Sequence, residues 1–230
     1  MAKKKFFISG TDTDVGKTLI GAGILEAANR KGLRTVAMKP IAAGCEQTEQ
    51  GLRNEDALTL IDAMSLELPY SQVNPIAFEP PIAPHIAAMR ENKTLSVSRL
   101  TGFCNGILMQ SSDFVVIEGA GGWRVPLNPR ETLADLAIEL NLPVVMVVGM
   151  RLGCINHAIL TAEAIERDGL KVAGWVANRV DPEMSCYEEN LMTLKTLIQA
   201  PLLGEVPFLE NANKDAVADC LDIDPLLSDD

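Results

Sequence analysis

The chain has few histidines and no closely spaced cysteines, which excludes several common kinds of site. Only His85 and His157 occur in 230 residues, so a histidine-based metal site and a Ser-His-Asp triad both have little support. The five cysteines lie far apart and form no Cys-x-x-Cys pair. That spacing suits buried thiols and not disulfides or a zinc site, and it predicts a cytoplasmic protein.

Positive charge and long apolar runs are also scarce. The 20 lysines and arginines are outnumbered by 31 acids, and the net charge is −11, which argues against nucleic acid and anionic membranes as partners. No apolar stretch approaches the length of a membrane span. The run behind Lys3–Lys5 ends at Ser9–Gly10, too early for a signal peptide. A small-molecule partner remains the simplest expectation.

What the chain does contain is a regular alternation of apolar strand-like runs with helix-like segments. Hydrophobic residues make up 47% of the chain, enough to bury a substantial core. Strands are predicted at Lys5–Ile8, Thr35–Lys39, Phe114–Glu118, Val144–Val148, Val172–Ala177 and ending at Leu203–Val206. Helices are predicted near 17–31, 54–64, 96–111, 132–140, 155–168 and 186–199.

Several of these strands are almost unbroken apolar runs, which is typical of strands buried on both faces. The pattern predicts a doubly wound α/β fold: a mostly parallel sheet with helices on both faces, of the P-loop NTPase type. Residues 1–230 are expected to form one domain. After Asn213 we expect one short helix and a mobile acidic tail, Ser228–Asp230.

A glycine-rich stretch, Ser9–Thr18, lies between the first strand and the first helix. Strand, glycine-rich turn and helix form the context of a phosphate-binding loop, in which Lys17 reaches the outer phosphates and the Thr18 hydroxyl contacts magnesium. The loop has five residues between Gly10 and Gly16, one more than the common motif. Asp12 and Asp14 would repel phosphate unless they face a metal or a cationic substrate. The alternative is a plain strand-to-helix turn with a solvated lysine.

Charged residues stand directly after other predicted strands. Lys39 either reaches out to solvent or points into a site. Asp56 follows Asn54, a plausible N-cap, and acids in a first helical turn are common because they complement the helix dipole. Glu118 ends an apolar strand, where a buried acid requires a metal or a cation as partner, and the glycines of Gly119–Gly122 let backbone approach a ligand closely.

Later segments offer weaker signals that leave alternatives open. Asn74–His85 carries four prolines and predicts an ordered loop across the top of the sheet, with His85 as a ligand contact or, preferably, a helix cap. Gly153–Asn156 begins a helix and is either a second anion site or an ordinary helix start. Asn178 either binds a base edge or closes a turn. The Pro207–Phe208 loop suits packing against a flat ring.

Together these segments resemble the dethiobiotin synthetase family, ATP-dependent carboxylases that close the ureido ring on the route to biotin. The resemblance runs from Phe6 to about Leu209. It is carried by Gly10–Thr18, Lys39-Pro40, Arg53–Ala57, Pro84-His85, Glu118–Gly122, Gly153–His157 and Leu202–Pro207. The longer phosphate loop is the form that this family has.

The resemblance implies a set of site residues. The ATP site would comprise Asp14, Val15, Gly16, Lys17, Thr18, Leu19, Asp56, Glu118, Gly119, Ala120, Gly121, Asn178, Arg179, Pro207, Phe208 and Leu209. Within it, Thr18, Asp56 and Glu118 would hold Mg2+, and Asn178 with Pro207–Leu209 would hold adenine. The catalytic residues would be Lys39, Lys17 and Thr11. The substrate would contact Asp12, Lys39, Ala43, Gly153, Cys154 and Asn156.

The resemblance also implies the reaction: CO2 adds to one amine of 7,8-diaminononanoate as a carbamate, ATP phosphorylates the carbamate, and the second amine closes the ring. Family enzymes are homodimers, and Gly153–Asn156 of a partner subunit would hold the substrate carboxylate. One departure concerns Ala43, where the family commonly has a serine. The loss removes one hydrogen bond, worth about 0.5–1.5 kcal/mol, and leaves room for a related diamine.

Two other functions compete with this one. A different ATP-dependent ligase or amidase on the same fold would act on some other amine or carboxylate. A nucleotide-switched partitioning ATPase would typically carry a lysine directly after the first glycine of the loop, where this chain has Thr11. It would also tend to have a membrane or polymer contact surface, which this acidic chain does not show.

Overall fold

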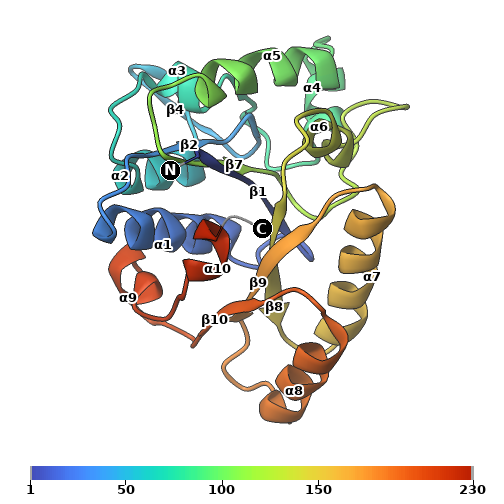
Figure 1. Ribbon diagram of the computed structural model, residues 1–230. Helices are drawn as coiled ribbons and strands as arrows, with labels where there is room; N and C mark the ends of the chain where they lie inside the picture. Colours follow the sequence, from blue (N-terminus) through green and yellow to red (C-terminus); the bar gives the residue numbers. More distant parts are fainter. Residues whose placement is uncertain (1, 229–230) are drawn as a thin grey trace.

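The structure is a computed structural model and describes residues 2–228. A six-stranded sheet runs through its middle (Figure 1), with every pair of neighbouring strands parallel. In spatial order the strands are β10 (Leu202–Val206), β9 (Val172–Arg179), β8 (Val144–Met150), β1 (Lys4–Gly10), β7 (Phe114–Glu118) and β2 (Thr35–Met38). The predicted parallel sheet is confirmed.

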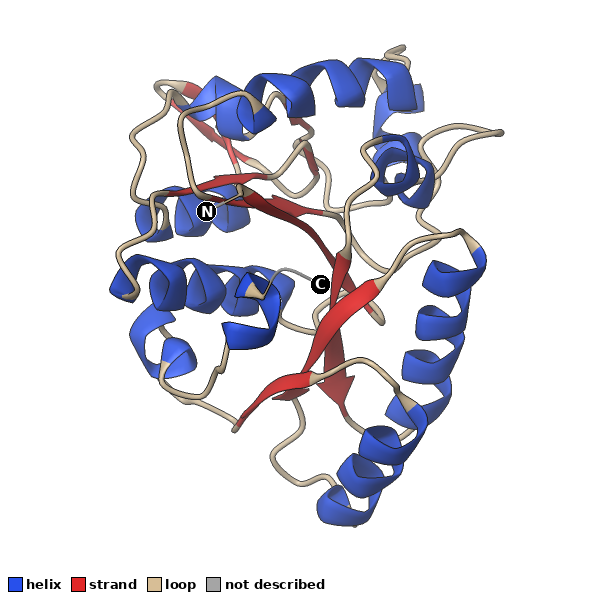
Figure 2. Cartoon of the chain, in the orientation of Figure 1, coloured by secondary structure: helices blue, strands red, loops and turns tan. Residues whose placement is uncertain are grey.

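The central strands are buried because helices cover both of their faces (Figure 2). On one face lie α1 (Lys17–Arg30), α2 (Glu55–Ala63), α9 (Lys214–Ala218) and α10 (Asp224–Leu227). On the other lie α5 (Val97–Leu108), α6 (Leu133–Glu139) and α7 (Cys154–Arg167), with α8 (Tyr187–Leu197) beside α7. No helix among residues 2–228 is both long enough and apolar enough to cross a membrane.

The proline-rich segment differs from the prediction of a plain loop. Within it β6 (Ile76–Ala77) pairs in parallel with β3 (Ile41–Ala42). The last two residues of the segment are already the first two residues of α4 (Pro84–Arg90). Proline is favoured at the first helical position because its missing N–H would have no partner there. His85 therefore lies inside the first turn of α4 and does not cap it, so the expected cap was wrong.

Three further differences concern short elements. Helix α3 (Tyr70–Val73) and the hairpin of β4 (Glu46–Thr48) and β5 (Gly51–Arg53) were not predicted from the sequence. The single helix expected after Asn213 is two short helices, α9 and α10. Of the expected mobile tail, residues 229–230 lie outside the described residues.

The topology places the informative loops together. β1, β2 and β7 are adjacent and parallel, so their carboxyl ends share one edge of the sheet, where ligands bind in this class of fold. The loop Thr11–Gly16, here called the phosphate-type loop, follows β1, Lys39 follows β2, and Glu118 is the last residue of β7. Asn54 caps α2, its Oδ1 accepting from the Ala57 N–H at 3.2 Å, and thereby brings Asp56 to the same edge.

Candidate active site

The loop between β1 and α1 is held in a strained, tightly supported shape. Asp14 (φ 56°) and Gly16 (φ 86°) both occupy the left-handed region, which costs a non-glycine residue free energy unless the surroundings enforce it. The buried Asn178 side chain is one such constraint, because its Nδ2 donates to the Val15 carbonyl at 2.9 Å. A Cβ on Gly16 would lie 2.2 Å from that nitrogen, so only glycine fits.

Lys17, the first residue of α1, is largely buried. Its Nζ donates to the Asp12 carbonyl at 2.9 Å. Burial, and after it the nearby positive charge of Lys39, lower the pKa of Lys17 to about 8. Among residues 2–228 no carboxylate forms an ion pair with Lys17, so its ammonium would gain from binding an anion.

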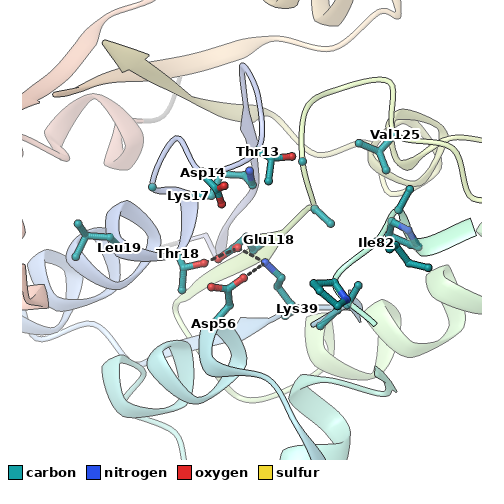
Figure 3. A pocket seen from close by; sticks show the side chains of 18 residues that line it. Thr13, Asp14, Lys17, Thr18, Leu19, Lys39, Asp56, Ile82, Glu118 and Val125 are labelled. Atoms are coloured by element: carbon teal, nitrogen blue, oxygen red, sulfur yellow. Dashed lines mark hydrogen bonds and ion pairs between the residues drawn. The ribbon is translucent and has the colours of Figure 1, made fainter. Parts of the chain in front are cut away.

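The buried Lys39 lies between two carboxylates, the buried Glu118 and the partly exposed Asp56 (Figure 3). Its Nζ is 2.5 Å from Glu118 Oε1 and 2.6 Å from Asp56 Oδ2, and the Thr18 hydroxyl donates to the same Glu118 oxygen at 2.8 Å. Lys39 and Glu118 are 4% and 0% exposed. Of the two readings that the sequence left open, Lys39 therefore points into the site and not to solvent.

The surroundings of Lys39 and Asp56 favour the charged form of each. Burial alone would lower the pKa of Lys39, but Glu118 and Asp56 together raise it above the ordinary value. Burial would likewise raise the pKa of Asp56, but Lys39 lowers it below the ordinary range. Paired charges of this kind are tolerated inside a protein only while each keeps its partner.

A cavity of about 730 Å³ opens over this cluster. Figure 3 shows Thr18 and Leu19 toward one end, Lys39 and Glu118 in the middle, and Ile82 and Val125 at the other end. Of the predicted site residues, those that line the cavity are Asp14, Gly16, Lys17, Thr18, Leu19, Lys39, Ala43, Asp56, Glu118, Ala120 and Gly121.

The other predicted residues do not line this cavity. They are Thr11, Asp12, Val15, Gly119, Gly153, Cys154, Asn156, Asn178, Arg179, Pro207, Phe208 and Leu209. Val15 is a buried core residue. Asp12, expected to attract an amine, instead has Arg151 as partner at 2.6 Å. Gly153 (φ 94°) follows Arg151 by two residues and directly precedes α7.

The cavity is also lined by residues that were not predicted from the sequence. They are Thr13, Ala42, Pro81, Ile82, Ala83, Pro84 and Val125. The proline-rich character of residues 74–85 indicated an ordered loop over the sheet, which is the signal for Pro81–Pro84. Thr13 lies between the two acids of the loop. Nothing in the local sequence indicated that Thr13 lines the cavity and Thr11 does not. No sequence signal distinguishes Val125.

The glycine-rich loop over a strand-end acid, with a buried lysine at the first turn of α1, defines a nucleotide-binding protein of the P-loop class. Two solved structures share this fold. The septum site-determining protein MinD complexed with Mg-ADP from Pyrococcus horikoshii matches with a TM-score of 0.58 at 12% identity, covering 94% of this chain and 86% of that one. A ParA family ATPase from Chlorobium tepidum matches at 0.56 and 14%, covering 95% and 91%. At such identities the likeness shows the fold alone.

Sequence comparison gives the family. An AAA domain family model matches residues 4–216. The chain is 60% identical over 227 residues to the ATP-dependent dethiobiotin synthetase BioD of Cellvibrio japonicus, with 99% of both chains covered. It is 59% identical over 221 residues to the protein of that name from Pseudomonas aeruginosa, with 96% and 97% covered. The chain belongs to the ATP-dependent dethiobiotin synthetase family.

Proposed function

We propose that this chain is an ATP- and Mg2+-dependent dethiobiotin synthetase, which converts 7,8-diaminononanoate, CO2 and ATP into dethiobiotin, ADP and phosphate. Near-full-length identity of 60% to a relative of that name supports the proposal. The observation that carries it in the structure is the buried Lys39, which Glu118 and Asp56 hold at the middle of the cavity next to Lys17.

The proposed reaction has three steps with balanced charges. One amine of the substrate adds to CO2 and loses a proton, which gives a carbamate. A carbamate oxygen attacks the terminal phosphorus of ATP, ADP leaves, and a carbamic–phosphoric anhydride forms. The second amine then attacks the carbamate carbon, phosphate leaves, and the ring closes with loss of a proton.

Two lysines suit the charge that develops in these steps. The carbamate and the transferring phosphoryl group are both anionic, so ammonium groups fixed beforehand stabilise the transition state. Lys17 Nζ contacts the Asp12 carbonyl and no carboxylate of the described residues, while Lys39 is held in place from both sides. Asp14, which lines the cavity, is the acid that we propose for the cationic amine, in place of Asp12 with its Arg151 partner.

The residues present fit a magnesium ion. Glu118 Oε2 is buried and has no hydrogen-bond partner among the described residues, while Oε1 of the same carboxylate accepts from the Thr18 hydroxyl and from Lys39, whose Nζ also contacts Asp56. Among residues 2–228 no three His, Cys, Asp or Glu side chains form a metal-type cluster. That suits Mg2+, which takes one or two carboxylates and completes its shell with waters and phosphate oxygens. When bound, the ion would neutralise phosphate charge, and Thr18, Asp56 and Glu118 would hold it.

Adenine binding is proposed at the ends of β9 and β10. The amide nitrogen of Asn178 is already used by the Val15 carbonyl, which leaves Oδ1 to accept from an exocyclic amine. Arg179 lies next to it, and Pro207–Leu209 follow β10, the strand paired with β9. The half-exposed Phe208 is available to pack against a flat ring.

The chain is further proposed to act as a cytoplasmic homodimer. Gly153–Asn156 do not line the cavity of their own chain, so the N–H groups at the start of α7 are proposed to hold the substrate carboxylate in a partner subunit's cavity. Leu152 and Leu160, beside and on α7, are 92% and 56% exposed, and apolar side chains in such positions favour a subunit contact.

One incubation tests the function. The protein, ATP, Mg2+, bicarbonate and 7,8-diaminononanoate are combined and analysed by mass spectrometry, with the diamine omitted in a control. We expect ADP and the cyclic urea to appear together and only with the diamine. ADP without the urea, or turnover only with another amine, would contradict the proposal and favour a related ligase.

A further inference from the structure

One wall of the cavity, formed by the segment Gly119–Val125, is held by the carboxylate of Asp168, which does not itself line the cavity. Glu118 is followed by a tight segment, Gly119–Val125, in which Ala120, Gly121 and Val125 line the cavity. A Cβ on Gly121 (φ 63°) would lie 2.9 Å from Val125 and 3.5 Å from Thr13 Oγ1. The segment is therefore close to the phosphate-type loop, and a small displacement of it would change the shape of the cavity.

Asp168, the residue after the last turn of α7, holds this segment from behind. One of its oxygens, Oδ2, accepts from the Trp123 indole N–H at 2.7 Å, and Oδ1 lies 2.7 Å from Arg124 Nη2. The Asp168 side chain is 14% exposed. Both oxygens thus contact consecutive residues of the Gly119–Val125 segment, and hydrogen bonds with a charged acceptor are the stronger kind.

The position of Asp168 directly after α7 is electrostatically unfavourable for the helix. Carboxylates are unfavourable at a helix C-terminus because the helix dipole is negative there. Trp123 is 3% exposed and its ring meets the Phe7 ring edge to face at 6.2 Å. A buried indole N–H needs an acceptor, and among the described hydrogen bonds Asp168 is the one that it has.

We propose that Asp168 is a positioning residue for the substrate end of the active site: through Trp123 and Arg124 it sets the place of Val125. This rests on the proposed function. Val125 lies at the opposite end of the cavity from Leu19 and Thr18 (Figure 3). Asp168 is therefore expected to act on binding of the diamine more than on binding of the nucleotide.

The test is steady-state kinetics of Asp168→Ala and Asp168→Asn with each substrate varied in turn. Since the wall contacts the substrate equally before and during reaction, we expect KM for the diamine to rise at least about fivefold in Asp168→Ala, with kcat and KM for ATP within about twofold of wild type. Asp168→Asn keeps one acceptor oxygen, so its KM for the diamine is expected to lie between that of wild type and that of Asp168→Ala. Glu166→Gln is the matched control, because it removes an acid from the same helix end at an exposed position.

A second measurement keeps the proposal testable if Asp168→Ala folds poorly. The Trp123 indole N–H signal in a 1H–15N spectrum should move in both Asp168 variants, while the buried Trp175 signal stays and Glu166→Gln leaves both unchanged. An unmoved Trp123 signal overturns the contact. An unchanged KM for the diamine, or equal rises in KM for diamine and ATP, overturns the positioning role. Absence of product with the wild-type chain instead overturns the proposed function itself.

Discussion

At the scale of single residues, the site depends on a few buried charges that neutralise one another. Lys39 and Glu118 are both inside the protein and have each other as partner. Removing one member of a buried pair is costly because the other remains as an uncompensated charge. The same two residues are therefore expected to affect both stability and turnover.

Lys39→Gln tests that coupling. We expect at least about a hundredfold loss of kcat, the usual scale for losing transition-state electrostatics, and a lower free energy of unfolding because Glu118 is left unpaired. Steady-state kinetics and urea denaturation measure the two effects, with Lys93→Gln, an exposed lysine, as control. Near-normal turnover would remove Lys39 from the reaction.

Ala43→Ser restores the hydroxyl that the family commonly has. Ala43 lines the cavity and its carbonyl accepts from Asn54 Nδ2 at 3.4 Å. One neutral hydrogen bond is worth about 0.5–1.5 kcal/mol, so KM for the diamine should fall about two- to tenfold in a substrate titration. No change in KM would show that the departure is neutral for this substrate.

At the scale of elements, small residues set how closely helices approach. The middle of α1 contains Gly21, Ala22 and Gly23, all buried. A Cβ on Gly23 would lie 2.3 Å from Val217 Cγ1 of α9. Helix α9 therefore packs on α1 at a distance that only glycine allows at position 23.

A pair of glycine substitutions separates packing from helix propensity. Gly23→Ala should lower the free energy of unfolding by about 1–3 kcal/mol because it overpacks the contact with α9. Gly106→Ala in α5, where nothing lies within 4 Å of the new Cβ, should raise it by about 0.4–1 kcal/mol. Urea denaturation of both variants checks this, and equal effects would contradict the packing account.

At the scale of the whole molecule, burial of Cys104 makes its thiol a reporter of unfolding. Burial raises its pKa to about 12, while Cys186 is exposed. Between about pH 9 and 12 the unfolded chain would lose this proton and the folded chain would keep it, so this group's contribution to stability falls as pH rises through that window. At pH 8 the folded thiol stays protonated and unreactive.

Thiol labelling with Ellman's reagent at pH 8 checks this expectation. Cys186 should react in the first phase, which Cys186→Ser should remove, and Cys104 should react only at the rate of global unfolding. Peptide mapping identifies the labelled residue. Fast labelling of Cys104 in the folded chain would show that the core around α5 opens locally.

The proposed homodimer also makes a prediction at this scale. Lys39→Gln damages the cavity, and Gly153→Val damages the α7 start because φ of 94° excludes a branched side chain. If the site is shared between subunits, refolding an equal mixture of the two inactive variants should restore about a quarter of wild-type activity, since half the dimers then contain one intact site. No restored activity would place all site residues within one subunit.

Much of this architecture follows from local sequence. The six strands, the first helix and the Asn54 cap were predictable because apolar runs, glycine placement and capping residues act over short stretches. That Thr13 lines the cavity and Thr11 does not was not predictable. This difference depends on the strained backbone at Asp14 and Gly16, which Asn178 supports from another strand. Val125 could not be predicted as a cavity residue either, because its position depends on contacts of its segment with residues distant in the chain.

The sequence by itself determined the class of fold, the phosphate-type loop and the set of charged residues that end its strands, since each is written in a local pattern. Only the tertiary structure decided which of these charges meet: Lys39 with Glu118 and Asp56, Asp12 with Arg151, and Asp168 with Trp123 and Arg124. Pairing between residues far apart in the chain depends on the order of strands in the sheet and on helix packing, which local patterns do not contain.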